Sequence, residues 1–245
     1  MHRTSSAAAT SGPDLWSSVA QRLHPDALAT PGGASVVVVL ALVFVVVAVP
    51  GWWTHARVVV TVVHELGHGL VGGLVGRRFT GLVLRGDMSG HAVTVGPARG
   101  PGRVLCTWSG YPAPAVVGAF ALHSVGAGWA PPVLAATAAL LLGSLVRVRS
   151  VYTATVMLIL TAVTAALWWW GAPAVQGGVL LGTGAFLLAG AWRHLAAVLA
   201  HAGAASDPAV LARLTRVPRW CWHASFVLVL AASSWWALRS LLAMA

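Results

Sequence analysis

The sequence predicts an all-α polytopic membrane protein with about seven transmembrane helices and a small β-hairpin on the cytoplasmic side. Of its 245 residues, 58% are hydrophobic and only 8% are charged, whereas about a quarter of the residues of water-soluble domains are charged. The hydrophobic residues occur in runs of about 20, the length that crosses the hydrocarbon core as a helix. Residues 1–33 are expected to form a polar N-terminal tail, and residues 34–245 a single membrane-embedded domain.

Within the tail, prolines interrupt the chain, and the most regular stretch predicts a short amphipathic helix over residues 15–28. The apolar runs that follow are each a candidate membrane span. The seven candidates are residues 34–53, 57–76, 104–128, 131–147, 150–170, 174–197 and 220–243.

One segment lacks the helical pattern. Residues 79–95 read FTGLVLRGDMSGHAVTV, in which two short β-prone runs flank a Gly-Asp-Met-Ser-Gly turn. This composition is typical of a β-hairpin. The hairpin is expected directly after the second apolar run.

The net charge of +10 comes from fifteen arginines and five acidic residues, because the chain contains no lysine. Most arginines lie in three links between apolar runs, residues 77–103, 147–149 and 213–219, whereas the links at 129–130 and 171–173 carry no charge. Cytoplasmic loops are enriched in basic residues, so these three links predict a cytoplasmic side, with the N-terminus inside and the C-terminus outside. Membrane orientation therefore explains the basic charge better than nucleic-acid binding does.

The composition also indicates a source. Ala, Val, Gly and Arg are abundant, and asparagine and lysine are missing. This bias is typical of a GC-rich bacterial genome, so the expected location is the bacterial inner membrane.

The second apolar run contains the sequence TVVHELGHGL, residues 61–70. His64 and His68 are four residues apart, so on a helix both imidazoles lie on one face and can bind one metal ion. Glu65, the only glutamate of the chain, lies beside them and is the candidate catalytic base. Ionisable groups inside a membrane cost a few kcal/mol each unless they face a partner or a cavity. This H-E-x-x-H pattern predicts a zinc site of the metallopeptidase type.

A catalytic zinc site usually has a third protein ligand. The remaining acids are Asp14 and Asp26 in the tail, Asp87 and Asp207. Asp87 fits the turn of the hairpin, and Asp207, followed by Pro208, fits the start of a helix. A capping residue can still direct its carboxylate elsewhere, so the residue pattern leaves both Asp87 and Asp207 as candidates.

Three further residues could contribute to a site. Cys106 and Cys221 are expected to be buried free thiols, because two scattered cysteines form no metal motif. Tyr111 is a candidate hydrogen-bond donor to an oxyanion, and a packing role explains it equally well.

Several motifs together resemble the site-2 protease family, in particular its small bacterial branch without appended domains. They are the membrane-embedded HELGH, the β-like segment after it, the sequence GYPAP at residues 110–114, and Ser206-Asp207 before a helix. The resemblance covers residues 57–225. Better-known members have glycine where this chain has Pro208, and an asparagine that this chain lacks.

The resemblance implies an intramembrane zinc metalloprotease with His64, His68 and Asp207 as metal ligands and Glu65 as the catalytic residue. Its substrates would be membrane-anchored proteins, cleaved near the cytoplasmic face of the lipid bilayer. The hairpin could hold an unwound substrate as an added strand.

The alternative is a catalytically inactive metal-binding membrane scaffold, or a transporter that uses the same histidines. A transporter is expected to carry further ionisable residues within its spans. This chain offers few of them, with Arg193 and His194 near one end of a run.

Overall fold

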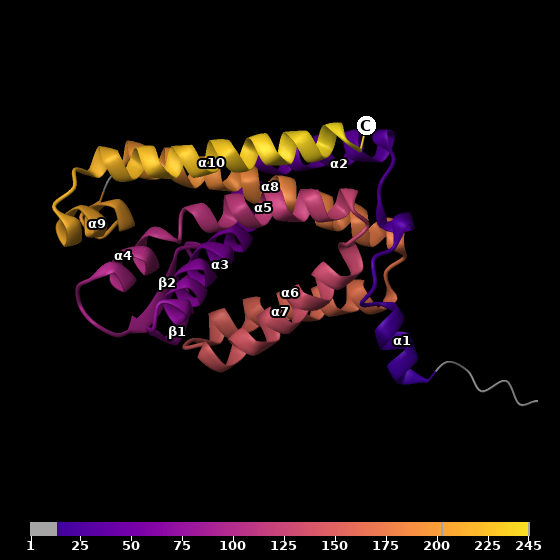
Figure 1. Ribbon diagram of the computed structural model, residues 1–245, viewed down its shortest axis with the longest axis horizontal. Coiled ribbons are helices and arrows are strands. Elements are labelled where there is room, and N and C mark those ends of the chain that lie inside the picture. The colour runs from indigo at the N-terminus through magenta and orange to yellow at the C-terminus, as the bar shows by residue number, and fades with distance from the viewer. Residues whose placement is uncertain (1–13, 202, 245) are drawn as a thin grey trace, which may run out of the picture.

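The computed structural model describes residues 14–201 and 203–244, most of which are helical. Figure 1 shows long helices that run along the long axis, with the hairpin and α9 at one end and α1 at the other. The elements in chain order are α1 Leu15–Gln21, α2 Gly33–Ala48, α3 Pro50–Leu74, β1 Arg78–Leu84, β2 Gly90–Val95, α4 Pro101–Trp108, α5 Pro112–Gly126, α6 Ala130–Ser144, α7 Val151–Trp170, α8 Pro173–Ala200, α9 Asp207–Thr215 and α10 Arg219–Leu242.

In the described part of the chain, four helices are long and apolar enough to cross a membrane: Ala130–Arg147, α7, α8 and α10. A fifth span is added if α2 and α3, which are bent by 104° at their junction, form one broken span. The expected count of seven spans is therefore not confirmed, although the mostly helical architecture is.

Two features explain the difference. The first break lies at Val49, which is extended, and Pro50, which opens α3, because a residue before proline avoids the helical conformation and proline suits the first helical position. The expected run 104–128 is likewise divided into α4 and α5, and Pro112 opens the second helix. As a result, α5 is a shorter apolar helix of 15 residues.

The described part of the N-terminal tail lies at the end of the molecule opposite the arginine-bearing links. The Asp26 amide donates a hydrogen bond to the Gly128 carbonyl oxygen (2.8 Å), and the Trp168 indole donates one to the Arg22 carbonyl oxygen (3.1 Å). We expected the tail at the same end as the arginine-bearing links. The difference arises because α2 and α3 form one bent pair, and Figure 1 places α1 and the C-terminus at the same end.

The helix expected over residues 15–28 is shorter than predicted. Its α-helical part, α1, ends at Gln21, and Ala27–Ala29 form a single 3₁₀ turn. The Asp26 carboxylate caps that turn by accepting a hydrogen bond from the Leu28 amide (2.9 Å).

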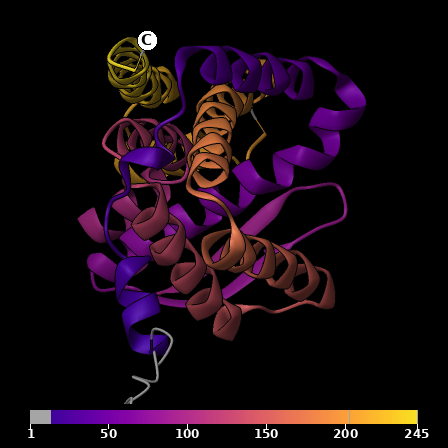
Figure 2. The same cartoon turned by 90° about the vertical axis from the view of Figure 1, so that its right-hand side faces the viewer.

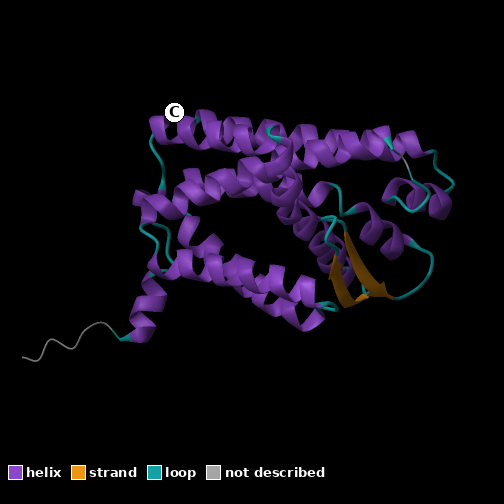
Figure 3. Cartoon of the chain, turned by 180° about the vertical axis from the view of Figure 1, so that it is seen from behind, coloured by secondary structure: helices purple, strands orange, loops and turns teal. Residues whose placement is uncertain are grey.

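The expected hairpin is present, and β1 pairs with β2 in antiparallel register (Figure 3). The outer edge of β1 is bonded to the segment that leads into α7: the Arg149 amide donates to the Leu82 carbonyl oxygen, and the Leu84 amide donates to the Thr153 hydroxyl (2.7 Å). On its other side, β2 packs against α3. The hairpin is thus held between α3 and the start of α7.

Small residues let α3, α5 and α8 approach closely. A Cβ atom on Gly118 of α5 would lie 2.6 Å from the Gly184 carbonyl oxygen of α8, and one on Gly190 would lie 2.5 Å from Val60 of α3. Close helix packing in membranes depends on such glycines. Half of the apolar 18-residue window of α8 is buried. Figure 2 looks along the bundle from the α1 end and shows α8 among the other helices. This packing fixes the position of α3.

Candidate metal centre

The three residues of the H-E-x-x-H motif lie on α3, where they face the interior. Glu65 is 5% exposed and His68 is 9% exposed. Because His64 and His68 are one helical turn apart, their rings meet, and the two Nε2 atoms are 3.2 Å apart. The motif therefore presents two imidazole nitrogens at one point.

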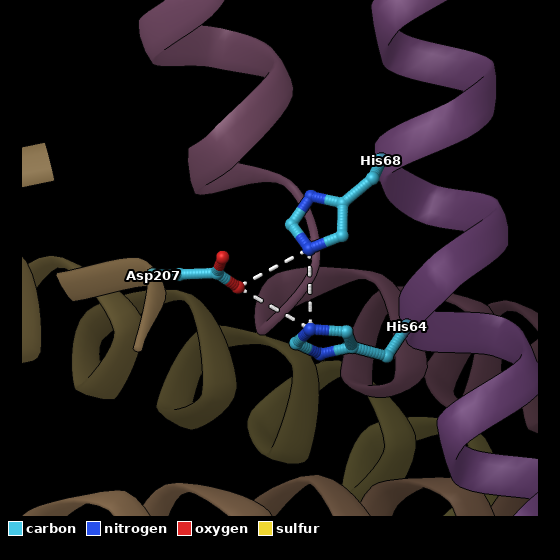
Figure 4. Close-up of side chains that lie close together, drawn as sticks. All are labelled: His64, His68 and Asp207. Atoms are coloured by element: carbon cyan, nitrogen blue, oxygen red, sulfur yellow. Dashed lines mark hydrogen bonds and ion pairs between the residues drawn. The ribbon is translucent and has the colours of Figure 1, made fainter. Parts of the chain in front are cut away.

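Asp207 completes this group from the opposite side of the site (Figure 4). Its Oδ2 atom lies 3.3 Å from Nε2 of His64 and 3.1 Å from Nε2 of His68. Ser206 occupies the N-cap of α9, and Asp207 is the first helical residue. The carboxylate is consequently free to point at the histidines, and a negative charge is favourable at a helix N-terminus.

The charge state of Asp207 follows from its surroundings. Burial raises the pKa of this carboxyl group, but hydrogen bonds from His64 and His68 outweigh burial and hold the pKa well below its usual range. The group is therefore an ionised carboxylate, the form that binds metal ions.

The spacing of the three ligand atoms suits a zinc ion. One atom from each residue lies within 4.8 Å of the others, and the closest separations are 3.1–3.3 Å. Zinc ligands at about 2.0–2.2 Å in tetrahedral geometry are roughly 3.3–3.6 Å apart. The nitrogen and oxygen donors are also those of catalytic zinc sites.

Gly110, between α4 and α5, leaves room for an ion. A Cβ atom on Gly110 would lie 2.7 Å from Nε2 of His64 and still closer to Nε2 of His68. Any other residue at this position would place its Cβ against the two imidazole nitrogens that would hold the metal. The absence of a side chain here fits a bound ion.

A backbone carbonyl orients one of the histidines. Nδ1 of His68 lies 2.6 Å from the Cys106 carbonyl oxygen, which also accepts a hydrogen bond from the Ser109 hydroxyl (2.9 Å). Nδ1 must carry a proton to donate to this carbonyl. A metal ion bound at the site would replace any proton on Nε2, which would then bind the ion through its lone pair. Nδ1 of His64 is buried and has no partner among the described residues.

Glu65 is held beside the group by β2. Its Oε2 atom accepts a hydrogen bond from the Ala92 amide (2.7 Å). The strand approaches so closely that a Cβ atom on Gly90 would lie 2.7 Å from Cγ of Glu65. The candidate base is thus positioned by a backbone amide from another element.

Two cavities meet at the site. The first, of about 280 Å³, lies between α3, β2, α4 and α9, and the second, of about 310 Å³, lies between α3, the hairpin turn and α8. His64, Glu65, Gly90 and Tyr111 line both of them. The site is therefore accessible from two sides.

The structure also shows where two other candidate residues, Asp87 and Tyr111, lie. The Asp87 carboxylate accepts hydrogen bonds from the Ser89 hydroxyl and amide, which hold the pKa of Asp87 below its usual range. Asp87 therefore has the turn role and lies outside the His-His-Asp group. Tyr111 stacks on Phe226 with its ring centroid 4.9 Å from that of His64.

Both cysteines are free thiols, as expected. Cys106 is buried as predicted, whereas Cys221, which was also expected to be buried, is only partly buried.

Sequence reasoning missed several groups that build the site. The Ala92 amide and the Cys106 carbonyl act through the backbone, which leaves no side-chain signature. Gly110 belongs to the GYPAP motif, but only the close approach of the histidines explains why glycine is needed there.

Two histidines and a carboxylate thus lie together among apolar helices, as a group that could hold a metal ion. In the comparison with family models, residues 36–237 match the family described as Peptidase M50B-like. The chain belongs to this family, which agrees with the resemblance to site-2 proteases and makes it a multi-pass membrane protein of a metallopeptidase family. No curated protein and no solved structure matched the chain.

Proposed function

We propose that the protein is an intramembrane zinc metalloprotease that hydrolyses peptide bonds of membrane-anchored substrates near the cytoplasmic face. The observation that carries the proposal is the convergence of three ligand atoms beside the Glu65 carboxylate, at the junction of two cavities. Membership of the Peptidase M50B-like family supports it.

His64, His68 and Asp207 are the residues that would hold the metal. Zinc, when bound, supplies Lewis acidity that lowers the pKa of water toward neutrality and polarises a carbonyl group. Glu65 acts as the general base, taking the proton of the attacking water and passing it to the leaving nitrogen. The Ala92 amide holds Glu65 in place for this task.

The substrate must be extended where it is cut. Each cavity is near or below the lower end of the volume of small-molecule sites, whereas a helix with its side chains is about 10–12 Å across. An unwound segment along β2, which lines the first cavity, fits this space. A substrate strand added to β2 would compete with Glu65 for the Ala92 amide. A substrate strand cannot pair with the outer edge of β1 either, because that edge is already bonded to the start of α7.

The end of the molecule that carries the arginine-bearing links is the cytoplasmic end in this proposal. In a bacterial inner membrane, the described part of the tail and the C-terminal end of α10 would then lie on the opposite side, because both are at the other end of the bundle.

Neither alternative function is favoured. A transporter would use ionisable groups within its spans, but the Arg193 guanidinium is bonded to the Val47 carbonyl oxygen and lies 4.4 Å from the Trp53 ring. Arg193 thus joins α8 to the α2–α3 junction. An inactive scaffold gives no reason for a carboxylate held beside the metal ligands.

The test is Glu65-dependent cleavage. Membrane proteomes of cells that express the wild-type protein or the Glu65→Gln variant are compared for protein fragments, and zinc is measured in both purified proteins. We expect fragments only with the wild type, and zinc in both proteins. Equal fragment patterns would refute the proposed reaction.

A further inference from the structure

The first cavity contains a charged side chain that the proposed reaction does not use. Arg103, in the first turn of α4, is partly buried and lines this cavity together with the metal-binding residues. In the part of the chain that the structure describes, its guanidinium makes no hydrogen bond or ion pair. Arginines elsewhere in the chain, such as Arg77 and Arg149, are bonded to backbone carbonyl oxygens.

The charges of the cavity do not balance without a further anion. Glu65 and Asp207 are its only carboxylates among the described residues. Their two negative charges would neutralise one divalent cation. The positive charge of Arg103 would then have no carboxylate of the cavity as its counter-charge. The Arg103 guanidinium therefore remains available to an anion that enters the cavity, and hydrogen bonds between charged partners are the stronger ones. The cavity is therefore electrostatically suited to a substrate that brings a negative charge.

The position of Arg103 sets where that charge would lie. Residues 103, 106 and 107 share one face of α4, and Cys106 contacts His68 through its carbonyl oxygen. Arg103 lines the same cavity as His64, Glu65, His68 and Asp207, so its guanidinium is available to a substrate segment bound there.

We propose that the first cavity contains an acid-selecting subsite, in which Arg103 pairs with an Asp or Glu side chain of the substrate near the scissile bond. This inference rests on the proposed function, because it requires a peptide substrate. A guanidinium and a carboxylate form two parallel charge-assisted hydrogen bonds, and their attraction strengthens where water is scarce.

The probe is a library of single-span reporter proteins with a fixed apolar span and a randomised six-residue segment at its cytoplasmic end. The Glu65→Gln variant in detergent, loaded with zinc, captures reporters without cutting them, and sequencing the captured pool gives the enrichment of each residue type. The same capture is performed with Arg103→Glu and with Arg99→Glu, each in the Glu65→Gln background. Arg99 is an exposed arginine of the same link, so the control changes the charge equally.

We expect the Glu65→Gln protein to enrich Asp and Glu in the segment by about tenfold or more, as a charge-assisted hydrogen bond provides. Arg103→Glu should reverse the preference toward Lys and Arg, whereas Arg99→Glu should keep the acidic preference. Zinc content, which should be unchanged in all three proteins, reports that the site is intact.

Several outcomes would overturn the subsite. They are no enrichment of acidic residues, an acidic preference that survives Arg103→Glu, or an equal loss in the Arg99→Glu control. The last result would assign the effect to the general positive charge of this end, as expected for arginines that contact anionic lipid. Failure of the proposed function would be recognised separately, because the wild-type protein would then cleave no member of the library.

Discussion

The carboxylate of Asp207, on the first residue of α9, lies 3.1 Å from Nε2 of His68 on α3, although the two helices are far apart in the sequence. Asp87, which follows the H-E-x-x-H helix much more closely in the chain, is instead engaged in the hairpin turn. The structure therefore distinguishes Asp207 from Asp87 as the candidate for the third metal ligand, whereas the residue pattern alone left both as candidates.

Asp207→Ala is therefore expected to weaken zinc binding by about 100-fold or more, since residues that only orient the ligands already contribute 10–100-fold. Asp87→Ala should leave zinc affinity nearly unchanged. Competition with a chelator of known affinity measures both variants. Equal zinc affinity in the two variants would exclude Asp207 as a ligand.

Gly110→Ala should abolish zinc binding, because the added Cβ would fill the space between the two Nε2 atoms. The matched control is Gly73→Ala on α3, where a Cβ would meet no atom within 4 Å. Zinc content and thermal unfolding of both purified proteins check the prediction. Stoichiometric zinc in the Gly110→Ala protein would show that the ion binds elsewhere.

Ala92→Pro removes the amide that holds Glu65. This amide points at α3, so the pairing of β2 with β1 should survive, and proline is tolerated at such an edge position. We expect turnover to fall by about tenfold or more, in line with a hydrogen bond to a charged group, while zinc content stays constant.

Val93→Pro is the companion variant for the hairpin. Val93 is the neighbour of Ala92 and pairs with Gly81, so in an alternating strand its amide faces β1. Loss of this amide should reduce turnover and also destabilise the hairpin, which is measured as a lower unfolding temperature.

If the Ala92→Pro variant retains full turnover, the Ala92 amide does not position Glu65.

Reporter fusions test the sidedness. A reporter inserted after Gly100 should be cytoplasmic, whereas reporters at the N-terminus and after Ala245 should both be external, because the described tail packs beside Gly128 and basic links stay inside. The sequence alone had predicted an internal N-terminus. A cytoplasmic N-terminal reporter together with an external C-terminal one would restore that topology.

Local pattern was sufficient for much of the fold. Apolar runs and helical spacing placed His64, Glu65 and His68 on one helix, and alternation around a glycine-rich turn predicted the hairpin of β1 and β2. Both features depend on neighbours within a few residues, so they can be read from the sequence directly. The family resemblance, rather than the residue pattern, singled out Asp207.

The relative placement of these elements was decided by tertiary structure. Pro50 is visible in the sequence as a helix start, but the 104° bend there depends on how α2 and α3 pack on α8. The approach of α9 to α3, the Ala92 amide at Glu65 and the bare Gly110 beside the histidines all join segments distant in sequence. Hydropathy and helix propensity are properties of short segments, whereas distances between ligand atoms follow from the packing of many side chains at once.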